Sequence, residues 1–191
     1  MKKQKVCIIG GGLTGLITAL SLSKLNLNID LISGNIEQNP KSSRTIAISQ
    51  KNFDFLKTMN IFKFKKDKFW PCSKMQLFTQ NTNEKFLKIF EIDKNNNKEI
   101  LYMIENNKII QLLKNKIKSI KSISLKKNKN ISEINNTELM RSIKYGNNSS
   151  RYNLVIICTG NNSDLVKKYF CDQYIENSYK EVAVTTILNH S

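Results

Sequence analysis

Short apolar runs separated by polar stretches predict alternating strands and helices along most of this chain. Residues 6–9 form one such run and residues 29–32 form another, each as long as a buried strand. Between them, Leu13, Leu16 and Leu20 recur at the spacing of a helix that buries one face. The beginning of the chain is therefore predicted to form a strand, a helix and a second strand, in that order.

The middle of the chain carries the pattern of paired strands. Residues 74–80 and 85–92 predict two strands joined by an asparagine-rich turn, and residues 100–104 predict a third. A helix is expected over about 106–117, and another is expected after Ser49, a candidate N-cap. This region is therefore predicted to combine an antiparallel sheet with helices.

The last part of the chain returns to longer apolar runs. Residues 119–145 alternate apolar and polar positions, which favours a meander of short strands. Residues 152–158 form a continuous run typical of a buried parallel strand. A helix capped by Ser163 and a final strand over 181–189 are expected to follow. The order predicts an α/β protein whose parallel sheet is interrupted by an inserted antiparallel sheet.

A glycine-rich turn joins the first strand to the first helix. Gly10 permits the tight turn, Gly12 leaves room for a pyrophosphate to approach the backbone, and Gly15 allows close helix–strand packing. The helix N-terminus adds unpaired N–H groups and a partial positive charge. This fingerprint predicts dinucleotide binding, and its spacing fits FAD and NAD(P) alike. The candidate contacts in the turn are Gly10, Gly11, Gly12, Leu13, Thr14 and Gly15.

The acidic residue that usually ends the second strand and binds the ribose hydroxyls is absent. Ser33 occupies that position. Asp30 lies in the middle of the strand, and Glu37 follows in the loop. Ser33 is the candidate ribose contact, although a serine hydroxyl does not supply the charge of a carboxylate.

Composition narrows the classes of function. The 191 residues carry a net charge of +16, but the lysines are spread along the chain and no nucleic-acid motif is present. We therefore expect no nucleic-acid partner, and at most a peripheral contact with anionic lipid. The four cysteines lack metal-ligand spacing, so reduced thiols and no metal site are expected. The basic N-terminus and the apolar run after it resemble a signal peptide, but the glycine turn interrupts this run. We therefore expect a cytoplasmic protein, with any membrane contact at the inner face of the membrane.

In this order, the segments resemble the N-terminal half of group A flavin-dependent monooxygenases, above all the ubiquinone-biosynthesis hydroxylases. VCIIGGGLTGLITALSLSKLNLNIDLIS is similar to their FAD fingerprint, and SSRTIAIS is similar to their R-x-x-A-L-S segment. MIENNKIIQLL resembles the segment before a helix that lies along the flavin, and YNLVIICTGNNSDLVKK resembles the segment that ends in an Asp-Gly pair. By this resemblance, the further cofactor contacts are Arg44, Asn107, Thr159 and Gly160.

The resemblance implies a Rossmann-like FAD-binding domain with an inserted antiparallel sheet, similar to p-hydroxybenzoate hydroxylase but truncated. The FAD-binding domain would comprise residues 1–70 and 105–170, and part of a substrate-domain sheet would comprise 71–104 and 171–191. Thr159 replaces the aspartate of the Asp-Gly pair, and Asn107 stands where arginine or glutamine is frequent. The C-terminal half of the family, with its second Gly-Asp motif, is not in this sequence.

The family's activity implies FAD, NAD(P)H as reductant, O2 and a polyprenylated phenol as substrate. No residue is singled out as catalytic, because the cofactor carries the chemistry. The missing half, or other ubiquinone-pathway proteins, are the implied partners. Two alternatives stay open: a non-catalytic dinucleotide-binding module or fragment without turnover, and an NAD(P)-linked Rossmann protein, which the inserted sheet disfavours.

Overall fold

A computed structural model describes residues 3–34, 44–58, 69–80, 85–93, 99–137, 139–160 and 163–173. The chain divides into two compact units. The first combines Met1–Ser43 with Lys114–Ser191, and the second is Arg44–Leu113. Each unit has its own sheets, so each is described by itself.

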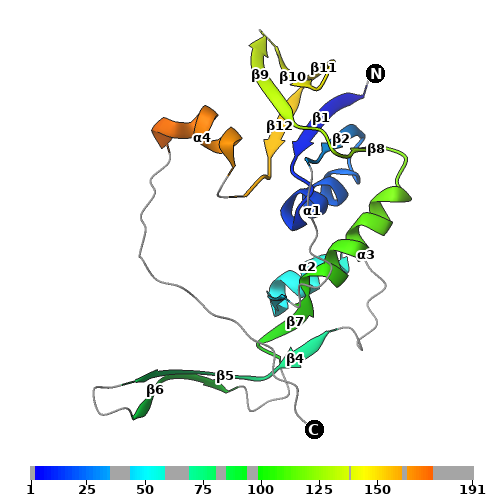
Figure 1. Cartoon of the computed structure of the whole chain (residues 1–191). Coiled ribbons are helices and arrows are strands. Elements are labelled where there is room, and N and C mark those ends of the chain that lie inside the picture. Colours follow the sequence, from blue (N-terminus) through cyan, green and yellow to red (C-terminus); the bar gives the residue numbers. More distant parts are fainter. Residues whose placement is uncertain are drawn as a thin grey trace. The chain divides into compact units, whose positions relative to one another are not determined.

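A four-stranded parallel sheet organises the first unit (Figure 1). Its strands follow the order β12-β1-β2-β8. Their bounds are β1 Gln4–Ile9, β2 Leu27–Ile32, β8 Ile123–Lys126 and β12 Leu154–Ile157. All three pairings are parallel, and Ile8 of β1 lies opposite Leu31 on one side and Ile156 on the other. Strands from the two ends of the sequence therefore lie side by side.

Helix α1 (Leu13–Leu22) packs against β1 and β2 through small and branched residues. Leu16 and Ala19 of the helix, and Ile8 and Leu31 of the strands, have no exposed surface. These positions are those that the sequence pattern assigns to a buried helix face and to a buried strand. The predicted strand–helix–strand order is therefore confirmed for this segment.

An antiparallel sheet of three strands covers the opposite face of the parallel sheet from α1 (Figure 1). Its strands are β9 Ile131–Thr137, β10 Met140–Tyr145 and β11 Asn148–Tyr152. Cys7 and Ile9 from β1 form one core cluster with Ile143, Tyr145 and Tyr152 from this sheet. Alternate residues of β1 thus point to the helix on one face and to the antiparallel sheet on the other.

Two sequence-based predictions for this region need correction. The run 152–158 is not one strand: β11 ends at Tyr152, and β12 begins at Leu154. Asn153 separates them, with its side-chain oxygen accepting a hydrogen bond from the Lys5 backbone N–H at 2.8 Å. The meander expected over 119–145 is also only partly right, because β8 joins the parallel sheet. The predicted burial of this run is also only partly right, because β12 is an edge strand whose residues are exposed or half-buried.

A buried ionic cluster joins the two sheets. The Tyr152 hydroxyl donates a 2.7 Å hydrogen bond to the Asp30 carboxylate, which also lies 3.3 Å from Lys5 Nζ and 3.1 Å from Lys126 Nζ. Burial alone raises the pKa of Asp30, but the hydrogen bonds from Tyr152 and Lys126 and both lysine charges outweigh it, and the net pKa is lowered. Asp30 is therefore engaged with Tyr152 of β11 and with two lysines of the parallel sheet.

Removal of the Tyr152 hydroxyl tests this cluster. We expect Tyr152→Phe to lower the free energy of unfolding by about 2 kcal/mol at neutral pH, because a hydrogen bond to a buried charge is lost. Folding lowers the pKa of Asp30, so its carboxylate stabilises the folded state fully at any pH above its unfolded pKa of about 4. This stabilisation is lost as the pH falls through the pKa of Asp30 in the folded state. Urea titrations of both proteins at neutral and acid pH should show a difference that shrinks in acid. An equal difference at both pH values would contradict the assignment.

The second unit is built on another three-stranded sheet, of order β3-β7-β4, with antiparallel pairs. The strands are β3 Thr45–Ser49, β4 Trp70–Cys72 and β7 Leu101–Glu105. Helix α2 (Gln50–Thr58) packs on it through Phe53, whose ring stacks on Tyr102 at 4.1 Å between centroids. The Ser49 hydroxyl accepts a 3.3 Å hydrogen bond from the Asn52 N–H, so the predicted N-cap is confirmed.

Helix α3 (Asn106–Lys118) follows β7 directly, as predicted for 106–117. Its first residue is tied to the sheet, because the Asn106 N–H donates to the Arg44 carbonyl at 2.9 Å. The unit boundary falls within this helix, between Leu113 and Lys114.

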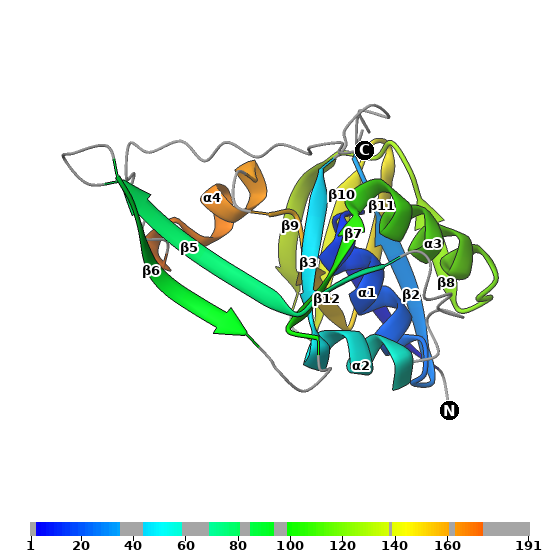
Figure 2. The same cartoon turned by 90° about the horizontal axis from the view of Figure 1, so that it is seen from below.

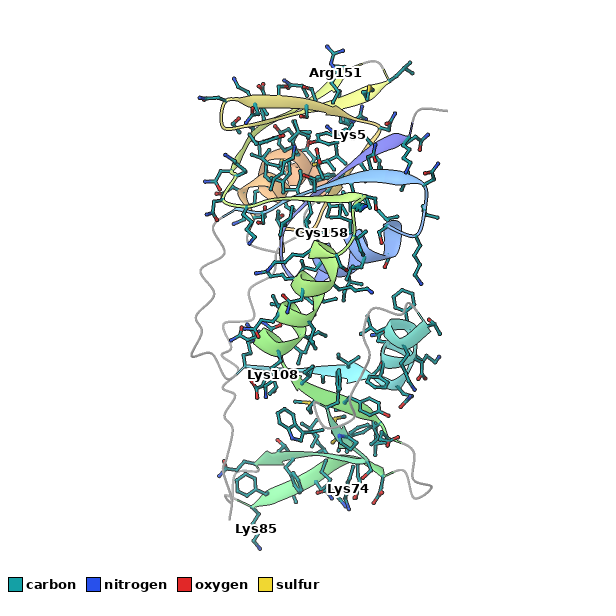
Figure 3. All side chains as sticks on the ribbon, turned by 90° about the vertical axis from the view of Figure 1, so that its right-hand side faces the viewer. Lys5, Lys74, Lys85, Lys108, Arg151 and Cys158 are labelled. Atoms are coloured by element: carbon teal, nitrogen blue, oxygen red, sulfur yellow. The ribbon has the colours of Figure 1, made fainter. Side chains whose placement is uncertain are left out.

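Among the strands that the structure describes, β5 (Lys74–Gln80) and β6 (Phe86–Asp93) pair with each other alone, in antiparallel orientation (Figure 2). Figure 3 places Lys74 and Lys85 toward opposite ends of this ribbon. Its large apolar side chains are exposed, and Phe86 keeps 73% of its surface in contact with solvent. The exposed members are Met75, Leu77, Phe78, Phe86, Leu87, Ile89 and Phe90.

The described chain ends with α4 (Asp164–Phe170) and a short 3-10 helix, η2 (Cys171–Gln173). Ser163 occupies the N-cap position of α4 without a side-chain capping hydrogen bond. The predicted turns at 81–83 and 95–97 and the strand at 181–189 lie outside the described residues. Within the described ranges, no helix is long and apolar enough to cross a membrane.

Candidate functional site

A crevice lies where the parallel strands of the first unit end. Residues that follow β1, β2 and β12 line pockets of about 470, 390 and 130 Å³. Gly34, next after Ser33 at the end of β2, lines all three. In open α/β sheets, ligands bind outside the carboxyl ends of the strands. The crevice is therefore the candidate ligand site of this unit.

Two of the three fingerprint glycines are required by the fold itself. Gly10 has a φ of +119°, and a Cβ there would lie 2.3 Å from the Cys158 carbonyl oxygen. A Cβ on Gly15 would lie 1.9 Å from the Gly10 carbonyl oxygen. The first permits the turn between β1 and α1, and the second lets the helix approach that turn.

Gly12 differs from these two, because a Cβ there would meet no atom within 4 Å. It caps α1 in an extended conformation that any residue adopts. The first helical hydrogen bond runs from the Leu16 N–H to the Gly12 carbonyl, so the N–H groups of the first turn have no partner within the helix. Gly12, Leu13 and Thr14 line the largest of the three crevice pockets. Nothing in the fold itself explains a glycine at this position.

Thr159 supplies an unsatisfied polar atom in the same crevice. Its Oγ1 is buried and, within the described residues, has no hydrogen-bond partner. Thr159 and Gly160 follow β12 and line the pocket together with the glycine turn. Gly160 has a φ of +82°, which favours glycine. A buried hydroxyl without a partner is costly unless a ligand supplies one.

Ser33 is buried at the end of β2, and its backbone pairs with the loop after β8. Its N–H donates to the Lys126 carbonyl at 2.9 Å, and its carbonyl accepts from the Lys129 N–H at 3.0 Å. It lines the smallest crevice pocket together with Gly11. The structure thus brings Ser33 next to the predicted phosphate turn.

Arg44 and Asn107 belong to the second unit. Arg44 precedes β3 and is exposed, whereas Asn107 is in the first turn of α3. Lys108 beside it lies 5.6 Å from the centroid of the Trp70 ring (Figure 3). The assignment of all the candidate cofactor contacts stays a prediction. Gly10–Thr14, Thr159 and Gly160 line one crevice pocket, and Ser33 lines a second pocket that shares Gly11 and Gly34 with the first.

Sequence reasoning missed three residues of the crevice. Gly34 was detectable as a glycine after a strand, but it was not singled out. Lys114 on α3 and Lys127 after β8 line the pocket of Ser33. No local signal marks these two lysines in a lysine-rich chain, because only the tertiary structure brings them to Ser33.

A second, larger groove of about 770 Å³ runs along the exposed edge of β12. Arg141, Leu154 and Tyr169 are among its lining residues. The Tyr169 hydroxyl accepts a hydrogen bond from the Ile134 N–H. This groove therefore follows the unpaired edge of β12, and its named lining residues do not form a cluster of catalytic side chains.

The cysteines differ sharply in environment. All four are free thiols, and no metal-binding cluster is found within the described ranges. Burial first, and the Asp30 charge second, raise the pKa of Cys7 to about 12, whereas Cys171 is exposed. Cys158 follows β12 and lines the largest crevice pocket together with the glycine turn.

Thiol labelling should reflect these environments. We expect a disulfide reagent at pH 8 to modify Cys171 in the native protein and to spare Cys7, because only the thiolate reacts and Cys7 is buried. Peptide mass mapping before and after denaturant identifies the sites. Rapid native labelling of Cys7 would show that the sheet core is open.

Comparison with known proteins gives a fold but no family assignment. No protein-family model matches the sequence. No curated protein matches it either. The structure of p-nitrophenol 4-monooxygenase PnpA from Pseudomonas putida DLL-E4 is similar, with a TM-score of 0.70 and 18% identity over 89% of this chain and 44% of that one.

Two further structures are similar at comparable levels. A candidate FAD-containing monooxygenase from Photorhabdus luminescens subsp. laumondii TTO1 has a TM-score of 0.67, with 16% identity over 88% of this chain and 43% of that one. Diels-Alderase PyrE3 of pyrroindomycin biosynthesis has a TM-score of 0.68, with 16% identity over 87% and 34%. The chain therefore has the fold of FAD-dependent aromatic monooxygenases, and it spans less than half the length of each of these structures. The presence of a Diels-Alderase shows that this fold does not fix the reaction.

Proposed function

We propose that this chain is the FAD-binding portion of a flavin-dependent monooxygenase that resembles the ubiquinone-biosynthesis hydroxylases. One observation carries the proposal: Gly12 leaves open space in a crevice at the strand ends, where the buried Thr159 hydroxyl has no hydrogen-bond partner among the described residues. The fold shared with monooxygenases supports FAD as the dinucleotide. The finer features, a Rossmann-like arrangement with an inserted substrate-domain sheet, belong to the same proposal.

The residues of the crevice fit a pyrophosphate. The N–H groups of the first turn of α1 face an anion favourably, and this turn carries no acidic side chain. Gly12 lets the phosphates approach the main chain, and the Thr159 hydroxyl is placed to donate to an oxygen of the ligand. Ser33 then lies at the ribose end. The chain's own contribution is to bind and orient the dinucleotide.

When bound and reduced by NAD(P)H, FAD supplies the oxygen-activating chemistry of such enzymes. The proposed substrate is a polyprenylated phenol. It would bind on a surface completed by a further polypeptide segment, the proposed partner of this chain. The β5–β6 hairpin supports such a partner, because a two-stranded hairpin with exposed apolar side chains is marginally stable alone.

Flavin titration of the purified chain tests the proposal. We expect FAD to bind with quenching of its fluorescence, and FMN, which lacks the adenosine and the pyrophosphate bridge, to bind at least tenfold more weakly. Oxygen uptake driven by NADPH, measured with and without the coding sequence downstream expressed as a partner, then tests turnover. Equal affinity for FAD and FMN would overturn the assignment of the glycine turn.

The second candidate is a non-catalytic dinucleotide-binding module. The fold is compatible with it, because the similar structures include a Diels-Alderase and the fold therefore does not fix the reaction. FAD binding without oxygen uptake, in the presence of the partner segment, would select this candidate.

A further inference from the structure

The groove along β12 is bounded by other elements of the first unit. Its described lining residues come from the outer edge of β12, from α4 and from the antiparallel pair β9–β10, and its volume is about 770 Å³. Figure 1 shows α4 and β9 near the same strand. The Ile134 N–H of β9 donates a 2.8 Å hydrogen bond to the Tyr169 hydroxyl of α4, so the two walls are joined. The groove is therefore a walled channel that contains the edge of β12.

The main chain of β12 has unpaired groups on this side. β12 is the last strand in the order of the parallel sheet, and no described strand pairs with its outer edge. Just after it, the Cys158 N–H donates to the Ile9 carbonyl of β1 at 2.7 Å. Because the main-chain groups of successive strand residues point alternately to the two sides, those of Val155 and Ile157 point to the outer edge. Such a row of N–H and C=O groups is a template for another strand.

The composition of this edge favours contact with another strand. Lysine, proline and β-bulges protect many natural sheet edges. The four residues of β12, LVII, carry no charge and include no proline, and their register with β1 has no bulge. Apolar side chains that line the groove are exposed: Leu139 keeps 91% of its surface in contact with solvent, Leu154 keeps 50% and Phe170 keeps 42%. The groove therefore offers apolar surface and unpaired main chain together.

The shape of the groove selects an extended segment over a second copy of this chain. Paired strands lie about 4.8 Å apart. Two copies that met edge to edge would bring the α4 walls of both into this space, whereas a single extended strand has no such walls. Arg141 is the one charged side chain among the described lining residues, and no ion pair is found for it within the described part of the chain. A strand with apolar side chains and one carboxylate therefore complements the groove.

We propose that this groove binds one extended strand of another polypeptide, which extends the sheet beyond β12. The main chain of that strand pairs with Val155 and Ile157. Its apolar side chains cover Leu139 and Leu154, and its acidic side chain lies beside Arg141. This mode of recognition is β-strand addition, in which main-chain hydrogen bonds give affinity and side chains give specificity. The inference rests on the proposed function in one respect only: the polypeptide is the partner segment that completes the substrate surface.

Amide hydrogen exchange of the free chain, resolved by NMR, tests whether the edge is open. The Val155 and Ile157 amides are expected to exchange at least tenfold faster than the Ile156 and Cys158 amides. The reason is that only the second pair points to β1. Comparable protection of all four amides would show that the edge is already covered in the free chain, and it would overturn the proposal.

Titration with a synthetic strand tests binding itself. The probe is a capped heptapeptide of alternating valine and threonine with one glutamate, added to the whole chain. Saturable binding is expected, with at least tenfold slower exchange of the Val155 and Ile157 amides. The matched control is the same peptide with alternate amides N-methylated, which keeps the side chains and prevents strand pairing. Absence of saturable binding, or equal affinity of the two peptides, would overturn the proposal.

Two variants of the groove test the main-chain and the apolar contacts separately. Val155→Pro removes an N–H group that points outward, at the kind of edge position where proline is tolerated. It should weaken the peptide at least tenfold and leave FAD affinity within twofold. Leu139→Ser removes an exposed apolar side chain and should weaken the peptide about fivefold, so it decides the matter if circular dichroism shows that the proline variant unfolds. Unchanged peptide affinity in either folded variant would overturn the proposal.

Two arginine variants separate the groove from the general positive charge of the protein. Arg141→Gln should weaken the glutamate peptide about threefold at low ionic strength and leave a glutamine version of the peptide unchanged. Arg151→Gln removes the same charge from an exposed position of β11 outside the groove, and it should change neither affinity (Figure 3). Equal losses in both variants would mean non-specific attraction and would overturn the place of the acidic side chain.

Light scattering identifies a second copy as the occupant if there is one. No dimer that depends on β12 is expected, and a dimer that Val155→Pro dissociates would overturn the proposal. Failure of this inference and failure of the proposed function are distinguishable. FAD binding without peptide binding overturns this inference alone, whereas peptide binding without FAD binding overturns the proposed function alone.

Discussion

Gly12→Val is expected to abolish FAD binding, with at least a hundredfold loss of affinity, while the protein remains folded. The backbone at Gly12 suits any residue, and its Cβ would enter open space. The valine side chain would therefore not strain the fold, but it would occupy the place where a pyrophosphate approaches the main chain. The measurements are FAD fluorescence titration for affinity and far-UV circular dichroism for folding.

Gly12→Ala provides the graded control for this prediction. Its single methyl group should weaken FAD less than valine does, because it fills less of the same space. Unchanged FAD affinity in both variants would place the dinucleotide elsewhere, even if the wild-type chain binds flavin. Unfolding of Gly12→Val would instead show that the open space at this position is needed by the fold.

Gly15→Ala is expected to have the opposite profile, a loss of folding whatever the ligand. Its Cβ would lie 1.9 Å from the Gly10 carbonyl oxygen, a backbone atom that a rotamer change cannot move. Ordinary overpacking costs about 1–3 kcal/mol, and a backbone contact this short should exceed about 3 kcal/mol. Because a domain of this kind has a total stability of about 5–15 kcal/mol, much of the protein should unfold at moderate urea concentrations.

Urea denaturation followed by circular dichroism measures this effect, with Gly12→Ala as the control. Both variants replace a glycine of the same turn by alanine, but only Gly15 has a neighbour in the way. A large difference between their midpoints is expected. Equal midpoints would show that α1 shifts away from the turn without cost, which would contradict its close packing on β1.

Local patterns were sufficient for most individual elements. The strands β1, β2, β5, β6 and β7 and the helices α1 and α3 lie where hydrophobic spacing places them. The Ser49 cap also follows from a local rule, since a hydroxyl next to a helix start finds an unpaired N–H group. Such features depend on neighbours within a few residues, and the sequence displays those neighbours directly.

The wrong predictions concern strand boundaries and strand pairings that depend on residues far away in the sequence. Tyr152 was predicted as part of one strand with residues 154–157, because residues 152–158 form one mostly apolar run in the sequence. It instead ends β11, and its hydroxyl reaches Asp30, 122 residues away. Similarly, residues 123–126 were expected in a meander but pair with β2. The pairing partners of these strands lie far away in the sequence, so a local pattern does not reveal them.

The amino-acid sequence by itself determined the glycine turn and the absence of a carboxylate at Ser33, because both depend on residue type at a fixed local spacing. Only the tertiary structure decided which glycine faces open space, since the Cβ positions of Gly10 and Gly15 are blocked by backbone folded against them and that of Gly12 is not. It also brought Lys114 and Lys127, from separate elements, to the pocket of Ser33. The charge of a pocket depends on which side chains lie close together in space, and residues far apart in the sequence give no local sign that they meet.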